Sequence, residues 1–162
     1  MNLSMPKRRA PRIMGVASCK NEIGLCVCDP WQIRGDLSLS FKEKPSNLKL
    51  KIFSFVSQQK PKVIVLLEEM PAKVESMARK IKAIRGLDLV RIEKGKVLGH
   101  LQGKSTKALR KRIASLFPSQ VKVIDGDASL LACATAITCL HLFDFPSRTY
   151  VRPTSKRKNK NP

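Results

Sequence analysis

The sequence predicts an α/β fold in which a mixed central sheet, a three-strand meander followed by parallel strands, is flanked by helices. Its first 41 residues contain short runs rich in Val, Ile, Leu and Cys, separated by turn residues. Beyond them, apolar strand-like runs alternate with segments of helical periodicity. The chain has 162 residues, 43% of them hydrophobic. That length suits one core, and we expect a domain over residues 12–146.

The meander is expected from three short strands. Residues 13–18 and 24–29 form the first two, and "KNEIG" between them is a turn in which Asn21 and Gly24 supply permissive backbone. Residues 36–41 alternate apolar and polar side chains, which predicts a third strand.

The segment that follows, residues 45–59, fits two interpretations. Alternation at Leu48, Leu50 and Ile52 suggests a strand, whereas Ser46 after Pro45 is typical of a helix start. We favour the helix, because its apolar side chains then share one face: Leu48, Ile52, Phe55 and Val56.

Two strand-then-helix units come next. The continuous apolar run at residues 62–67 is typical of a central parallel strand. A helix is predicted over residues 72–85 and ended by Gly86, and "LDLVRIE" is the next strand. The inward face of that helix is expected to carry Val74, Met77, Ala78, Ile81 and Ile84.

The last third of the chain predicts a glycine-rich connection, a basic amphipathic helix stopped by Pro118, a short extended piece at 121–124, and a final helix from Asp127 to about Phe143. The amphipathic helix should turn Leu109, Ile113 and Leu116 inward, and Lys107, Arg110, Lys111 and Arg112 largely outward. The expected order is therefore β-β-β-α-β-α-β-α-α.

The chain is strongly basic. Lys and Arg number 32 against 12 acids, a formal net charge of +20. Nucleic acid is the favoured partner, because phosphate contacts and counterion release exploit such a charge. An anionic membrane surface or simple solubility are the alternatives. Residues 1–11 and 147–162 are predicted to be basic disordered arms.

No membrane span or secretory signal is expected, because no apolar run follows the basic start and the uncharged stretch 129–143 is short for a bilayer. We expect a cytoplasmic, nucleoid-associated protein. The cysteines fit no zinc spacing, so they are interpreted as reduced thiols, with Cys26 and Cys28 on one strand face.

Four segments together resemble the ribonuclease H-like nucleases, in the branch of the RuvC Holliday-junction resolvases and the YqgF factors of ribosomal RNA processing. "IMGVASCKNEIGLCVCDP" resembles the first hairpin, and "VIVLLEEMP" the central strand that ends in a catalytic Glu. "GHLQGKSTKALRKRIASLFP" resembles the resolvase segment before a basic helix. "IDGDASLLACATAI" resembles the acid-led final helix. The last two segments favour the resolvase branch.

The resemblance implies a metal-dependent nuclease site. Carboxylates in this fold converge on one or two Mg²⁺ (or Mn²⁺) ions that activate water and hold the scissile phosphate. Glu68 matches the strand position, and Asp125 and Asp127 are candidates from the helix start. The family's first Asp, however, falls on Ala17. A methyl group cannot ligate, so the implied metal site is weak or absent.

Each of these residues also has a plainer explanation. Glu68 could be a solvated strand end, and Asp125 and Asp127 could be helix-capping acids. The expected nucleic-acid contacts are Lys20, Lys104, Lys107, Arg110, Lys111 and Arg112, any of which could simply face water. Trp31 could stack on a base, although packing is favoured. His100 and His141 are expected to have no catalytic role.

Three functions remain open. The first is a RuvC-like endodeoxyribonuclease, impaired by Ala17, that binds Holliday junctions or other branched DNA. The second is a YqgF-like nuclease factor acting on ribosomal RNA precursor. The third is a non-catalytic nucleic-acid-binding structural protein. The resemblance also suggests a homodimer formed through the helix at 72–85, although the basic side chains of that helix could equally face DNA.

Overall fold

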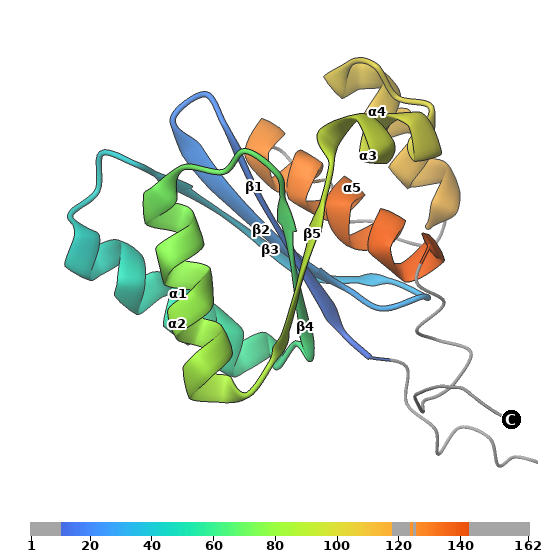
Figure 1. Cartoon of the computed structure of the whole chain (residues 1–162). Coiled ribbons are helices and arrows are strands. Elements are labelled where there is room, and N and C mark those ends of the chain that lie inside the picture. Colours follow the sequence, from blue (N-terminus) through green and yellow to red (C-terminus); the bar gives the residue numbers. More distant parts are fainter. Residues whose placement is uncertain (1–10, 118–123, 125, 143–162) are drawn as a thin grey trace, which may run out of the picture.

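The computed structural model describes residues 11–117, 124 and 126–142, which form one five-stranded sheet with helices on both faces (Figure 1). The sheet order is β3-β2-β1-β4-β5. β1 pairs antiparallel with β2 and parallel with β4. The predicted mixed sheet, a meander followed by parallel strands, is therefore confirmed. Its strands are β1 (Ile13–Cys19), β2 (Glu22–Cys28), β3 (Ile33–Ser40), β4 (Val63–Leu67) and β5 (Asp88–Ile92).

The turn between β1 and β2 is tighter than the sequence suggested. Cys19 pairs with Glu22, which leaves only Lys20 and Asn21 in the loop. Both have positive φ, 50° and 66°, as two-residue hairpin loops require. Gly24 lies inside β2 instead, so its predicted role in the turn is wrong. A Cβ there would overlap the backbone of Ala128 in the helix above.

The helices divide between the two faces of the sheet (Figure 1). One face carries α1 and α2, which contact β3 and β4–β5. The other carries α5, which lies on β1 and β2 and is itself covered by α3 and α4. The helices are α1 (Pro45–Gln59), α2 (Ala72–Arg85), α3 (Lys94–Leu101), α4 (Thr106–Leu116) and α5 (Asp127–Leu142).

The core centres on α5, whose residues from Ala128 to Leu140 are all buried. Small side chains let this helix approach the sheet closely, and Gly15 of β1 lies directly beneath Ala132. The hydroxyls of Thr135 and Thr138 donate to carbonyls one turn earlier, so neither is buried without a partner. None of the helices in the described part of the chain has the length and apolar run that crossing a membrane needs.

The ambiguous segment after the meander is helical, as favoured, and Pro45 rather than Ser46 opens α1. The expected order lacked α3, whose sequence KGKVLGHL contains two glycines that lower its helical propensity. The buried side chains of Val97 and Leu101 compensate. Ile84 was predicted to face inward, but it is 65% exposed. The predicted extended piece at 121–124 lies largely outside the described residues, and both terminal arms lie outside them almost entirely.

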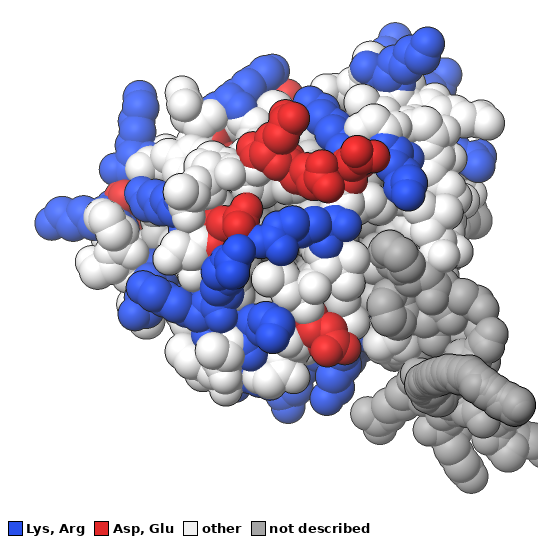
Figure 2. All heavy atoms as spheres, viewed as in Figure 1, with Lys and Arg blue, Asp and Glu red and all other residues white. Residues whose placement is uncertain are grey.

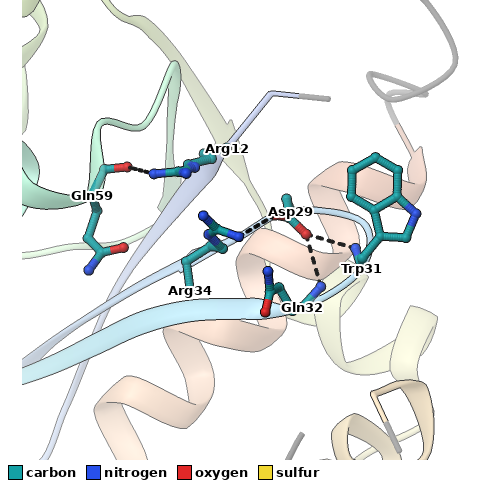
Figure 3. Close-up of polar contacts among 6 residues, drawn as sticks. All are labelled: Arg12, Asp29, Trp31, Gln32, Arg34 and Gln59. Carbon is teal, nitrogen blue, oxygen red and sulfur yellow. Dashed lines mark hydrogen bonds and ion pairs between the residues drawn. The ribbon is translucent and has the colours of Figure 1, made fainter. Parts of the chain in front are cut away.

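The turn from β2 to β3 is built on Asp29 (Figure 3). Its Oδ1 accepts hydrogen bonds from the backbone N–H groups of Trp31 and Gln32, both at 2.9 Å. Its Oδ2 lies 3.5 Å from a guanidinium nitrogen of Arg34. Trp31 extends from this turn with 69% of its surface exposed, so the expectation that it packs inside is wrong.

Candidate functional site

Three segments distant in sequence meet at one edge of the sheet. β1 and β4 run parallel with Val16 beside Leu66, so both strands end at this edge. α5 begins above it, because the first turn of α5 contacts Gly24, the cross-strand neighbour of Ala17. An ion pair between Lys20 and Asp127, with Nζ and Oδ2 2.9 Å apart, joins the β1–β2 loop to the start of α5. The strands that lead to Ala17 and Glu68 thus end, and the helix that begins with Asp127 thus starts, on the same side of the sheet.

Ala17 lies beneath the start of α5. Side chains alternate along a strand, so Ala17 lies on the same face of β1 as Gly15. Gly15 contacts α5, and so does Gly24, the cross-strand neighbour of Ala17. Its methyl group is fully buried. The position is therefore enclosed by packing, and its side chain offers no oxygen to a metal ion.

Glu68 and Glu69 follow directly on β4 and are both exposed. The backbone N–H of Glu68 donates to the carbonyl of Ile92 at 2.8 Å, which extends the pairing of β4 with β5 by one residue. Glu69 has a φ of 66°, so the chain turns sharply there. The backbone thus fixes where Glu68 emerges, while its carboxylate stays in solvent.

A third acid joins this region, and the sequence reasoning missed it. Glu93 follows β5 directly and is exposed, and Leu67 pairs with Ile92 at the ends of the two strands. Figure 2 shows acidic side chains gathered on the upper part of this face, among scattered Lys and Arg. The signal was available in the sequence, because carboxyl ends of neighbouring parallel strands meet at one sheet edge.

Asp127 is the first residue of α5, and its side chain is 30% exposed. The helix N-terminus favours a negative charge there. Lys20 supplies the opposite charge, and the hydrogen bond and charge of Asp127 raise the pKa of Lys20. Asp125, the other candidate from this segment, lies outside the described residues.

The described carboxylates do not form a magnesium site. Within residues 11–117, 124 and 126–142, no group of three side chains close enough to share an ion contains a carboxylate. Asp127 is already paired with an ammonium group, and the side chain of Ala17 is a methyl group, which cannot bind a metal ion. Mg²⁺ requires several hard oxygen ligands in octahedral geometry, which these residues do not present.

The predicted basic contacts divide into two groups. Lys20, Lys104, Lys107, Lys111 and Arg112 are exposed, and of these Lys20 is paired with Asp127. Arg110 is half-buried instead, and its guanidinium donates to the carbonyl of Ile124 at 3.3 Å. The expectation that Arg110 points largely outward is therefore wrong, because it ties α4 to the segment that leads into α5.

His100 and His141 form a pair that the sequence did not suggest. Nε2 of His100 lies 2.8 Å from Nδ1 of His141, and the rings meet edge to face with centroids 5.1 Å apart. Burial lowers the pKa of His141, and the charges of His100 and Arg112 lower it further. The pair links α3 to the end of α5.

The same architecture occurs in solved structures of Holliday-junction resolvases. RuvC of Thermus thermophilus, in complex with a Holliday junction substrate, is 9% identical and superposes with a TM-score of 0.66, covering 78% of this chain and 91% of its own. The yeast mitochondrial Holliday junction resolvase is 14% identical, with a TM-score of 0.55 and coverage of 83% and 81%. The fowlpox virus Holliday junction resolvase is 7% identical, with a TM-score of 0.52 and coverage of 82% and 99%.

The chain has the ribonuclease H-like fold. No protein-family model and no curated protein sequence matches it. At identities of 7–14%, the likeness to these three structures concerns the fold alone. In this ribonuclease H-like fold, the edge formed by β1, β4 and α5 is the candidate site.

Proposed function

We propose that this protein binds branched DNA of the four-way-junction kind, and that its capacity to cut that DNA is impaired. The observation that carries the proposal is the meeting of β1, β4 and α5 at one edge, with Ala17 where an acid is expected. The fold supports the type of substrate, and the missing carboxylate supports the impairment.

Charge favours a nucleic acid as the partner. The net charge of +20 attracts a polyanion. Lys104, Lys107, Lys111 and Arg112 are exposed before and along α4, and α4 packs on α5, which begins at the candidate edge. These cations would grip the backbone of a strand laid across that edge and would read no sequence.

The similar structures favour a branched substrate over plain duplex. All three are resolvases of Holliday junctions, and one is bound to such a junction. They come from a bacterium, a yeast mitochondrion and a poxvirus. The shared architecture at low identity is the reason to test a junction first and an RNA second.

The local contacts explain why cutting should be impaired. No three of the described ligand side chains that include a carboxylate lie close enough together to share a Mg²⁺ ion. The carboxylate of Asp127 is also paired with the ammonium group of Lys20. Glu68 is exposed and takes part in none of the ion pairs among the described residues. Exposed carboxylates that do not converge on one point bind Mg²⁺ too weakly to position a scissile phosphate.

The test compares a synthetic four-way junction with a linear duplex of the same sequence and with an RNA hairpin. We expect the wild-type protein to bind the junction at least about tenfold more tightly than the duplex, a difference of about 1.4 kcal/mol. In Mg²⁺ or Mn²⁺ it should leave the junction essentially uncut. Equal affinity for junction and duplex would contradict the proposal, and preference for the RNA would favour ribosomal RNA processing.

The impairment is tested by restoring the missing acid. Ala17→Asp should increase metal-dependent cutting of the junction, although a carboxylate at this buried position lowers the stability of the fold. Ala17→Asn is the matched control, because it has the same shape without the charge. Adding Glu68→Gln to Ala17→Asp should remove the gained activity. A wild-type protein that cuts as fast as Ala17→Asp would refute the impairment.

A further inference from the structure

Three buried thiols form a cluster beneath α5 that the proposed function does not use. Cys26 and Cys28 lie on the α5 side of β2, and Cys133 lies on the facing side of α5. All three side chains are 0% exposed. Their sulfur atoms all lie within 4.8 Å of one another, with Cys26–Cys28 and Cys28–Cys133 at 3.8 and 3.9 Å.

The spacing of the sulfur atoms suits a single soft metal ion. A metal–sulfur bond of about 2.3 Å places thiolates about 3.8 Å apart in a tetrahedral site and about 4.0 Å apart in a trigonal one. Two of the three separations match these values. Thiolate ligands select Cu(I) and Zn(II) rather than Mg²⁺ or Ca²⁺.

The three thiols shift one another's pKa. Hydrogen bonding to Cys133 and burial raise the pKa of Cys26 and Cys28. The same thiol hydrogen bonds lower the pKa of Cys133.

A disulfide explains the cluster less well. Cys26 and Cys28 are two apart on one strand, where Cα atoms are separated by roughly 6.6 Å, near the upper limit for a disulfide. Simple packing is the other explanation, because a small side chain is needed where β2 approaches α5. Packing alone, however, does not require three sulfurs in mutual contact from two different elements.

We propose that Cys26, Cys28 and Cys133 bind one thiophilic metal ion, Cu(I) or Zn(II), between the sheet and α5. The three-sulfur set is complete for Cu(I). Zn(II) prefers four ligands, and the fourth would come from Asp36, which pairs with Cys26 across β2 and β3 and so shares its face. Because the sulfurs are buried, the ion enters as the chain folds.

The test refolds the full-length reduced chain anaerobically with Cu(I), with Zn(II), or with neither, and measures retained metal after gel filtration. We expect about one equivalent of Cu(I) or Zn(II) per chain and a raised melting temperature. Co(II), in place of Zn(II), should give visible d–d bands and thiolate charge-transfer bands. A wild-type chain that retains neither Cu(I) nor Zn(II) overturns the proposal without recourse to any variant.

Variants locate the site. Cys26→Ala/Cys28→Ala should lose the retained metal. Cys139→Ala is the matched control, since Cys139 is a fully buried thiol of α5 that belongs to no such cluster among the described residues, and it should retain the ion. Cys19→Ala tests the half-buried thiol at the candidate edge. Metal retained by the double variant, or lost equally from Cys139→Ala, overturns the assignment, as does loss of two titratable thiols to a disulfide in the purified protein.

Discussion

At the residue scale, side chains that look alike in sequence have different surroundings. Arg110 and Lys111 are neighbours on one basic helix, yet Arg110 donates to a backbone carbonyl and Lys111 faces solvent. His100 and His141 are far apart in sequence but share a hydrogen bond. Such differences determine what each residue contributes, and each can be measured.

The histidine pair predicts a pH dependence of stability. The folded pKa of His141 is below its ordinary value of 6.5, so the unfolded chain takes up a proton first as the pH falls. The contribution of neutral His141 to the free energy of unfolding is therefore complete above pH 6.5. It is lost as the pH falls through the folded pKa of His141. Urea unfolding between pH 8 and pH 5 should show this decline.

His141→Gln tests the origin of that decline, because glutamine does not titrate and can still accept a hydrogen bond from His100. We expect its urea midpoint to fall less steeply with pH than that of the wild-type protein. Parallel curves for the two proteins would assign the pH dependence to other groups.

The two neighbouring basic residues of α4 should separate stability from binding. Arg110→Ala removes the bond to Ile124 and the packing of a half-buried side chain, and should cost about 1–2 kcal/mol of unfolding free energy. Lys111→Ala should leave stability within about 0.5 kcal/mol and weaken DNA binding. Chemical denaturation and junction titration of both variants check this, and the reverse pattern would contradict it.

At the element scale, the surroundings of each segment decided its structure where local signals were weak. α3 contains two glycines, yet forms because Val97 and Leu101 bury against the core. Gly24 looked like a turn residue, and it lies instead inside β2, where α5 comes too close for any side chain. Both errors arose because sequence patterns do not show how closely two elements approach.

Two glycines should therefore respond in opposite ways to the same substitution. Gly24→Ala places a methyl group against the backbone of Ala128 and Ser129, which cannot move aside like a side chain, and should cost about 2 kcal/mol or more. Gly99→Ala in α3 meets nothing within 4 Å and should stabilise by about 0.5–1 kcal/mol. Thermal and urea unfolding measure both, and destabilisation by Gly99→Ala would argue against α3 as a helix.

At the scale of the whole molecule, the net charge of +20 is expected to drive the proposed association with nucleic acid. The predicted homodimer through α2 stays a prediction, and a light-scattering mass would test it. Exposed Ile84 lies on that helix among Lys73, Arg79, Lys80 and Lys82. The confinement of the protein to the cytoplasm also stays a prediction.

Charge-driven binding predicts a steep dependence on salt. Each phosphate contact contributes a slope of about −0.9 when the logarithm of the association constant is plotted against that of the salt concentration. Replacing Lys107, Lys111 and Arg112 together by Ala should reduce the slope on duplex DNA by roughly 2.7. Lys49→Ala/Lys51→Ala, on α1 across the sheet, is the control and should change it less. An unchanged slope in the triple variant would place the DNA elsewhere.

The sequence by itself determined the α/β class, the position of every strand, four of the five described helices and the basic character of the surface. These follow from local periodicity, strong turn residues and composition, which are properties of short segments. Glu68 and Asp127 were candidates because of the resemblance to the ribonuclease H-like nucleases, and each stands at the end or start of an element.

Only the tertiary structure decided which of those side chains meet. It brought β1, β4 and α5 to one edge, paired Lys20 with Asp127, joined His100 to His141, and gathered Cys26, Cys28 and Cys133 beneath one helix. These contacts span up to 107 residues of chain. They depend on strand register and on the close approach that Gly15 and Gly24 allow, and no local pattern in the sequence specifies either.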